Sequence, residues 1–291
     1  MVSVERLDPA AMFPAGRPDL RARYLHLASG MRIRVIEGGT ESAPAIAFIP
    51  GWACTPYIFR ETLGPVAAAG FRVIAVDLKG HGLSDKPASP AEYTVSAMRD
   101  NLLEVLDALG LARAGLVGHS MGAAVAVHAA AFDPARCAAL ALVAPVGFAG
   151  VPGLSLLRAL TPLSALPSIR RMVTPGLIRL MLRFVYGSGR QPTARDAAEF
   201  MAPVPFADFV LALRHLLHEF RWDEPFPTLA MPWLTIVGRE DRLSRSADAD
   251  RYRGPGLAMP VTVIDGVGHV VFDEAPDTVN SALIRFFRER S

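Results

Sequence analysis

Short apolar runs alternate with helix-like segments along most of this 291-residue chain. The predicted strands cover residues 23–27, 31–36, 45–49, 71–76, 114–117, 137–143, 233–237 and 261–264. The predicted helices between and after them cover residues 54–69, 94–109, 121–132 and 276–290. This alternation implies right-handed crossovers between neighbouring parallel strands. We therefore expect an α/β fold with a mostly parallel sheet and helices on both of its faces.

The alternation stops between residues 146 and 227, and we interpret this stretch as an inserted helical cap. We therefore expect an N-terminal extension at residues 1–22 and an α/β core formed by residues 23–145 and 228–291. Prolines divide the insertion into short helix-like pieces, at Pro152, Pro162, Pro167, Pro175, Pro192, Pro203 and Pro205.

The bulk composition excludes several classes of partner and site. A net charge of +2 with 20% charged residues, and no basic tail, argues against nucleic acid as a partner. The two cysteines, Cys54 and Cys137, lie far apart in the sequence, which argues against a disulfide framework and against a zinc site. We expect reduced thiols, a cytoplasmic protein and no metal.

Two uncharged windows, at residues 114–132 and 137–157, are long enough to resemble membrane spans. The first contains a Gly-Ser-Gly turn and the second is broken by prolines and glycines, so each is interpreted as a buried strand with its neighbouring segment. The N-terminus carries Glu5 and Asp8 and has no long apolar run. We expect neither an integral membrane segment nor a secretory signal.

The segment Gly118-His119-Ser120-Met121-Gly122 lies between a predicted buried strand and a predicted helix. A sharp turn there forces the serine backbone into a strained region, which only small neighbours tolerate, and lifts the hydroxyl clear of the sheet. This pattern predicts a nucleophile at Ser120. A glycine-rich turn with a serine helix cap is the structural alternative.

A serine hydroxyl needs a base that takes its proton, and the base needs an acceptor that orients it. His269 follows the last strand through a glycine-containing loop, which makes it the best placed of seven histidines. Asp241 follows the preceding strand, with Glu240 as its competitor. The order Ser120, Asp241, His269 is the order expected for a nucleophile at a strand–helix elbow.

Two backbone N–H groups must then face the developing oxyanion. We predict that Met121 donates one and that Trp52, in the Pro50-Gly51-Trp52 loop after the third strand, donates the other; an ordinary Pro-Gly turn is the alternative. Further candidates for contact with substrate are the side chains of Trp52, Cys54, His119 and Val270, together with apolar residues of the cap.

With these motifs the chain resembles the α/β-hydrolase fold superfamily, and carboxylesterase-like serine hydrolases in particular. The resemblance runs from about residue 23 to the end and implies an eight-stranded, mostly parallel sheet. It also implies acyl transfer through an acyl-enzyme, with no cofactor and with a small-molecule ester as substrate. The strip 77–84 would support the site, with His81 in a structural role. The motifs are the segments 48–52, 77–84, 118–122 and 238–241, and Gly268-His269 with Glu274 and Pro276.

Departures from the family pattern keep other activities open. The family usually has His-Gly where this chain has Pro50-Gly51, and proline lacks a backbone donor. A Pro-Gly-Trp loop also resembles the cofactor-free dioxygenases of this fold, which use a His-Asp pair. Haloalkane dehalogenases and epoxide hydrolases of the family place an aspartate at the elbow, so Ser120 argues against both. A slow-turnover ligand receptor is a third alternative.

Residues 151–190 contain six arginines and no Asp, Glu or Lys, interspersed with leucines. The simplest interpretation is an amphipathic cap helix at about residues 175–186 packed on the core. Alternatively, the apolar side lines an acyl or ring pocket while the arginines meet a carboxylate, an acidic acyl-carrier protein or an anionic membrane surface. An acyl-carrier-protein thioesterase or esterase would resemble the second arrangement and is a further alternative. The sequence leaves open the acyl length, the choice among ester, thioester and lactone, and whether the chain is a monomer or homodimer.

Overall fold

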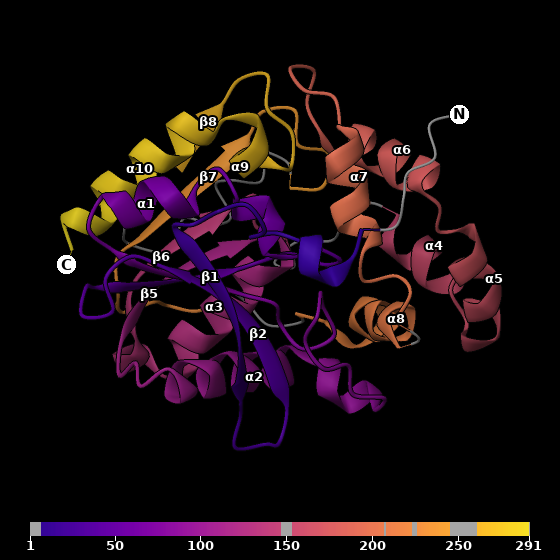
Figure 1. Cartoon of the computed structure of the whole chain (residues 1–291), viewed down its shortest axis with the longest axis horizontal. Helices are drawn as coiled ribbons and strands as arrows, with labels where there is room; N and C mark the ends of the chain where they lie inside the picture. The colour runs from indigo at the N-terminus through magenta and orange to yellow at the C-terminus, as the bar shows by residue number, and fades with distance from the viewer. Residues whose placement is uncertain (1–6, 147–152, 207, 223–225, 245–260, 291) are drawn as a thin grey trace.

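The computed structural model describes residues 7–146, 153–206, 208–222, 226–244 and 261–290. Eight strands form one sheet in the order β1-β2-β4-β3-β5-β6-β7-β8 (Figure 1). Within it β2 runs antiparallel to both β1 and β4, and the remaining neighbours pair in parallel. The strands are β1 (Leu20–His26), β2 (Arg32–Gly38), β3 (Ala45–Ile49), β4 (Arg72–Val76), β5 (Ala114–His119), β6 (Cys137–Val143), β7 (Trp233–Gly238) and β8 (Val261–Ile264).

Helices cover both faces of the sheet. In Figure 1, α2 (Val95–Ala108) and α3 (Met121–Phe132) lie below the sheet, while α1 (Leu63–Ala68) and α10 (Pro276–Arg288) lie above it. The short α9 (Val271–Glu274) directly precedes α10. The expected mostly parallel eight-stranded α/β sheet is therefore confirmed.

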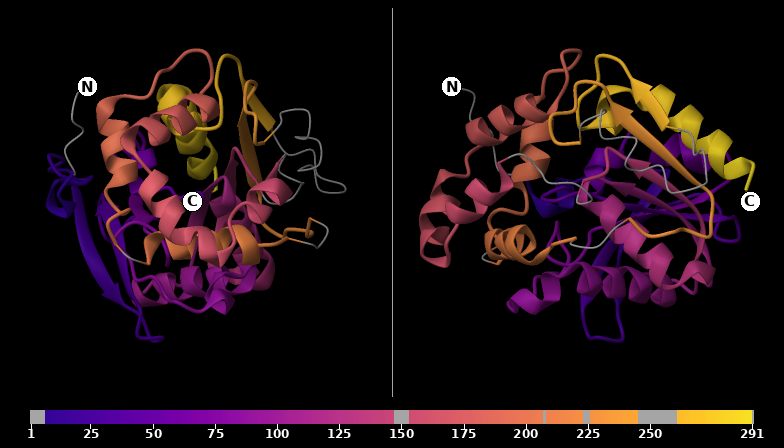
Figure 2. Two further views of the ribbon diagram at one scale, coloured as in Figure 1. Left: turned by 90° about the vertical axis from the view of Figure 1, so that its right-hand side faces the viewer. Right: turned by 180° about the vertical axis from the view of Figure 1, so that it is seen from behind.

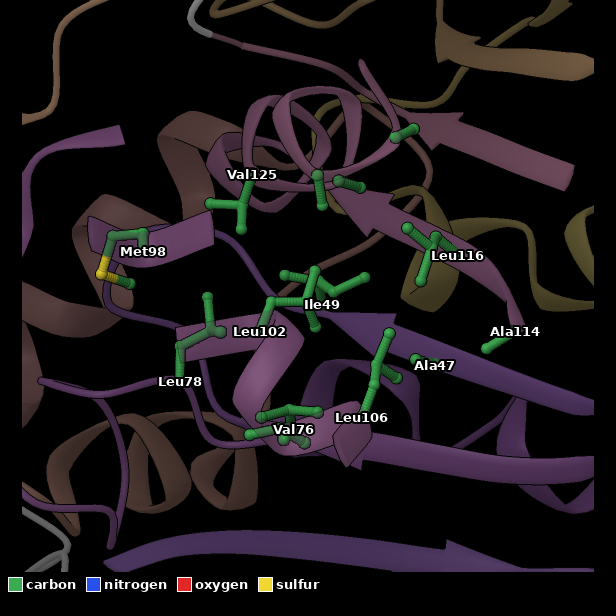
Figure 3. Packing of buried hydrophobic residues seen from close by; sticks show 14 of the residues in the cluster. Ala47, Ile49, Val76, Leu78, Met98, Leu102, Leu106, Ala114, Leu116 and Val125 are labelled. Carbon is green, nitrogen blue, oxygen red and sulfur yellow. The ribbon is translucent and has the colours of Figure 1, made fainter. Parts of the chain in front are cut away.

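Two apolar clusters fill the space between the sheet and these helices. Figure 3 shows the cluster on the α2 side, in which Met98, Leu102 and Leu106 of α2 share one buried apolar cluster with Ile49 of β3 and Val76 of β4. These α2 residues are spaced four apart, so they share one helix face, and all three are fully buried. The carboxyl ends of β3, β5, β6 and β7 meet at one edge of this rigid layer, which is where loops of an open parallel sheet place reactive groups.

Two predicted boundaries were wrong for local reasons. Strand β1 begins at Leu20, inside the predicted extension 1–22, because Leu20 pairs with Gly38 and buries its side chain while the next residues face solvent. The predicted helix 54–69 is a 3-10 turn at Pro56–Phe59 followed by α1. Proline lacks the N–H that an interior helical position donates, so α1 carries Pro65 in its first turn.

The described residues between β6 and β7 form the α-helices α4 to α8, which we call the helical insertion. They gather beyond one end of the sheet, on the right in Figure 1, and Figure 2 shows the same grouping from two other directions. Residues 1–6 of the predicted extension and residues 147–152, 207 and 223–225 of the predicted cap fall outside the described ranges. The helices are α4 (Leu154–Ala159), α5 (Leu166–Met172), α6 (Pro175–Val185), α7 (Ala194–Met201) and α8 (Phe209–Glu219).

Among the helices that the structure describes, none combines the length and apolar character needed to cross a bilayer. The uncharged window 114–132 is β5 plus α3, as expected, and both elements are buried in the core.

Candidate active site

The turn between β5 and α3 holds Ser120 in a strained conformation, with φ 55° and ψ −122°. A Cβ atom on Gly118 would lie 2.5 Å from the Ala123 Cα atom, and one on Gly122 would lie 2.2 Å from the Ile49 carbonyl oxygen. Contacts this short leave no room for a side chain, so both glycines are steric requirements of the turn. The predicted elbow geometry is present.

Strained residues gather at the carboxyl edge of the sheet. Within the described ranges, the non-glycine residues with positive φ are Ala53 (60°), Ser120 (55°) and Ala144 (46°), which follow β3, β5 and β6. These three strands are adjacent in the sheet. Unfavourable backbone conformations persist where the surrounding structure enforces them, and they concentrate at functional sites.

The side chains of Ser120, His269 and Asp241 form one hydrogen-bonded chain. The Ser120 Oγ and His269 Nε2 atoms are 2.9 Å apart, and His269 Nδ1 lies 2.8 Å from Asp241 Oδ2. With the Nδ1 proton donated to the carboxylate, the Nε2 lone pair faces the serine hydroxyl and accepts its proton. All three residues are at least 92% buried, so little water competes for these bonds.

Asp241 and its neighbour Glu240 have different partners. The second oxygen of Asp241, Oδ1, accepts the N–H groups of Leu243 and Ser244 at 2.7 and 2.9 Å, which fixes the orientation of the carboxylate. Glu240 instead accepts both the N–H and the hydroxyl of Ser188 in the connection after α6. Asp241 therefore reaches His269, and Glu240 does not.

His119 lies behind His269 and supports it. Its Nε2 lies 3.0 Å from the His269 carbonyl oxygen, and its ring packs against the rings of His269 and Phe272. Burial lowers the pKa of His119 to about 3, so the ring is neutral and donates its Nε2 proton to the carbonyl. The His119 side chain is 1% exposed, so protein atoms surround it. This differs from the prediction, in which His119 contacts the substrate.

The Pro50-Gly51-Trp52 loop lies directly against the serine. A Cβ atom on Gly51 would be 2.7 Å from the Ser120 Cβ atom, so only glycine fits there. In the part of the chain that the structure describes, the backbone N–H groups of Trp52 and Met121 donate to no protein acceptor. The Trp52 indole N–H donates to the Leu213 carbonyl of α8, which ties this loop to the helical insertion.

The loop that carries His269 is held by the last turn of α6 and the residues after it. The His269 N–H donates to the Val185 carbonyl at 2.7 Å. The Glu274 carboxylate accepts three further N–H groups, from Gly187, Gly268 and Val270, at 2.6 to 3.1 Å. Two of these three donors flank His269 in the sequence. Sequence reasoning noted Glu274 only as part of a motif, because contacts to backbone atoms leave no pattern of paired side chains.

A buried ionic cluster reinforces the same junction. Arg60, directly after the 3-10 turn at Pro56–Phe59, contacts Asp273 of α9 at 2.6 Å and Asp196 of α7 at 3.3 Å. Tyr186 donates to Asp273 and Tyr57 donates to Asp196, both at 2.8 Å. The cluster was not predicted from the sequence, since its members come from segments far apart in the chain and share no spacing.

The remaining candidates differ in exposure. The Cys54 side chain is partly buried, and desolvation raises the pKa of its thiol to about 12, so the thiol is protonated at neutral pH. Val270 is 5% exposed and is the residue directly before α9. His81 is fully buried, with Nδ1 3.2 Å from the Lys79 carbonyl, as expected for a structural histidine. Across the described ranges, no group of three or more His, Cys, Asp or Glu side chains is arranged to hold a metal ion.

Comparison with known proteins points to one family. A family model described as alpha/beta hydrolase fold matches residues 44–214. An epoxide hydrolase of Caballeronia sordidicola is 29% identical over 308 residues, covering 89% of this chain and 92% of the relative. Epoxide hydrolase A of Mycobacterium tuberculosis is 28% identical, with 89% and 94% covered. The crystal structure of Cfl2 from Burkholderia cenocepacia matches with a TM-score of 0.78 at 21% identity, over 92% of this chain and 96% of that one.

Proposed function

The chain belongs to the alpha/beta hydrolase fold family, and from this premise we propose that it is a serine hydrolase that cleaves a carboxylic ester or thioester. The observation that carries the proposal is the continuous hydrogen-bonded chain from Ser120 through His269 to Asp241. Such a chain raises the nucleophilicity of a hydroxyl by giving its proton an acceptor.

In the proposed reaction, Ser120 Oγ attacks the carbonyl carbon of the substrate and its proton passes to His269 Nε2. Asp241 stabilises the imidazolium that results. The tetrahedral intermediate collapses, the C–O or C–S bond breaks, and His269 gives its proton to the leaving group. Water then enters, His269 takes one of its protons, and attack on the acyl-enzyme releases the acid and restores the serine.

The N–H groups of Trp52 and Met121 are proposed to bind the oxyanion. Both lie beside the nucleophile, and neither has another acceptor within the described ranges. Pro50 is compatible with this role because the donor is two residues further along. Removing one such donor costs about 3 kcal/mol of transition-state stabilisation in comparable sites.

The relatives named as epoxide hydrolases raise a second possible reaction. A carboxylate nucleophile that opens an epoxide forms an ester, which water can then hydrolyse. A serine that opened an epoxide would form an alkyl ether, which has no carbonyl for water to attack. With Ser120 as the only elbow nucleophile, turnover of an epoxide through this route would stop after one cycle, so the site favours acyl chemistry.

We further propose that residues 146–227 act as a cap over this site and that the substrate is an apolar acyl or small aromatic ester. Trp52 supports the first point, since it joins the loop beside Ser120 to α8. The partly buried side chains of Trp52 and Cys54, on the loop beside Ser120, support the second.

The test is reaction with a fluorophosphonate probe, followed by hydrolysis of p-nitrophenyl esters of increasing acyl length. The proposal expects an adduct on Ser120 and a loss of at least 10³-fold in kcat/KM for Ser120→Ala. Equal ester hydrolysis by Ser120→Ala and wild type would refute it. Oxygen uptake with a heteroaromatic substrate that persists in Ser120→Ala would favour the cofactor-free dioxygenase instead.

A further inference from the structure

Large apolar side chains are exposed on α4, α5, α6 and the turns that join them. Eight of the eleven exposed large hydrophobic side chains in the described ranges fall between residues 156 and 184. Single exposed leucines are common on proteins, but a concentrated group marks an interaction surface. We call this group the α4–α6 face: Leu156, Leu157, Leu160, Leu163, Met172, Leu180, Met181 and Phe184.

The charges in this region have one sign. Residues 151–190 contain six arginines and no acidic residue or lysine. Of these arginines, Arg171, Arg179 and Arg183 are exposed and form no ion pair in the described part of the chain. Free cations with no acidic neighbour along 40 residues of sequence are complementary to an anionic partner.

Helix α6 places the apolar and cationic side chains on adjacent rows. Leu180 and Phe184 are 63% and 53% exposed and lie one turn apart, and Arg179 and Arg183 form the neighbouring row with the same spacing. Arg242, from the loop of Asp241, extends the cationic side because its guanidinium lies 5.2 Å from the centre of the Phe184 ring. This pairing of rows is typical of helices that lie in the plane of a membrane surface.

An apolar groove lies next to the α4–α6 face and adds to the apolar surface of this region. The groove has a volume of about 670 Å³, and Arg170 and Arg171 lie among its lining residues. Its apolar lining comes from α5, the end of α7 and α8, and includes Met201, Val204 and Val210. None of the proposed catalytic residues lines it, so the groove is separate from the site described above.

We propose that the α4–α6 face binds the surface of a membrane that contains anionic lipids. In such a surface the leucines and Phe184 enter the boundary of the acyl chains, while the long arginine side chains reach phosphate groups above them. A second copy of the chain fits less well, because a two-fold contact of this face with itself brings arginines against arginines. An acidic protein would match the charge but offers no continuous hydrocarbon layer for eight exposed apolar side chains. Figure 2 shows α4 to α6 at the outer end of the molecule, away from the sheet.

Co-sedimentation with vesicles tests this proposal on the full-length protein. The probes are vesicles of phosphatidylcholine alone and of equal parts phosphatidylcholine and phosphatidylglycerol, each at low and high salt. We expect binding to the mixed vesicles that weakens with salt, since each arginine near an anionic surface strengthens binding about fivefold. The triple variant Arg171→Gln, Arg179→Gln, Arg183→Gln should therefore bind roughly 100-fold more weakly. The double variant Leu180→Ser, Phe184→Ser should also lose binding.

The matched control replaces exposed residues of the same kinds elsewhere: Arg21→Gln, Arg113→Gln and Phe132→Ser. It should bind vesicles as wild type does, and the circular dichroism spectra and thermal midpoints of all variants show whether they fold. Absence of binding to mixed vesicles, or equal binding by the triple variant and wild type, overturns the proposal. So does a wild-type dimer that Leu180→Ser, Phe184→Ser converts to monomer without any vesicle binding. Binding of a purified acidic carrier protein in place of vesicles would assign the face to that partner.

Discussion

At the scale of single residues, the adjacent acids Glu240 and Asp241 provide a matched pair for mutagenesis. Asp241→Asn keeps the size of the side chain but removes the charge that selects the His269 tautomer. The same change in the serine-protease triad lowers kcat about 10⁴-fold, so we expect a loss of roughly 10³- to 10⁴-fold in ester hydrolysis.

Glu240→Gln is the control, because Glu240 contacts Ser188 and not His269. A substitution at this exposed position changes the free energy of unfolding by about 0.5 kcal/mol at most, so we expect the rate of ester hydrolysis to stay close to that of the wild type. Steady-state kinetics on one p-nitrophenyl ester measures both variants. Similar losses in the two would contradict the assignment of Asp241.

The same residues show what the sequence could predict. Ser120, Asp241 and His269 each follow a strand that the apolar pattern identifies, and the carboxyl ends of parallel strands share an edge, so their meeting was predictable. The groups that hold His269 in place could not be predicted in this way. Val185 acts through its carbonyl oxygen and Glu274 through bonds to N–H groups, and neither role depends on a recognisable side-chain pairing.

At the scale of elements, the backbone after α6 packs directly against the backbone of the loop that carries His269. A Cβ atom on Gly187 would lie 2.6 Å from the Gly268 nitrogen, whereas one on Gly189 would meet only the Gly266 carbonyl at 3.5 Å. We therefore expect Gly187→Ala to displace the His269 loop and lower kcat/KM by about 10²-fold, the loss typical of a catalytic group misplaced by about 1 Å.

Gly189→Ala, two residues away, serves as the control and should keep kcat/KM near the wild-type value. Measuring kcat and KM separately distinguishes misplacement of His269, which lowers kcat, from a change in substrate binding. Unchanged kinetics in Gly187→Ala would mean that the insertion does not position the base.

At the scale of the whole molecule, buried neutral histidines make stability depend on pH. Burial, assisted by the nearby charge of Lys86, lowers the pKa of His81 to about 4 from an ordinary 6.5. As the pH falls below 6.5, the unfolded chain binds a proton at this position that the folded chain does not bind, so stability is lost progressively toward pH 4. One such group contributes up to about 1.4 kcal/mol per pH unit.

Urea unfolding at a series of pH values between 7.5 and 4.5 measures this slope, roughly spanning the window set by the two pKa values. We expect His81→Asn to reduce the slope by about 1 kcal/mol per pH unit. His26→Asn, at an exposed position on β1, is the matched control and should leave the slope unchanged. Identical slopes for His81→Asn and wild type would contradict this account.

The attachment of the insertion to the loop of His269 also limits how such a chain can diversify. The carbonyl of Val185, the N–H of Gly187 and the carboxylate of Asp196 belong to the insertion, yet they fix the core residues around the base. In a chimera that takes the whole segment between β6 and β7 from another protein, residues of that other protein would hold the loop of His269. Helices α4 and α5 lie outside these contacts and are tied instead to α8, through Arg158 to the Leu217 carbonyl and through Arg214 to the Thr161 carbonyl, so we expect that exchanging them would leave the support of His269 in place.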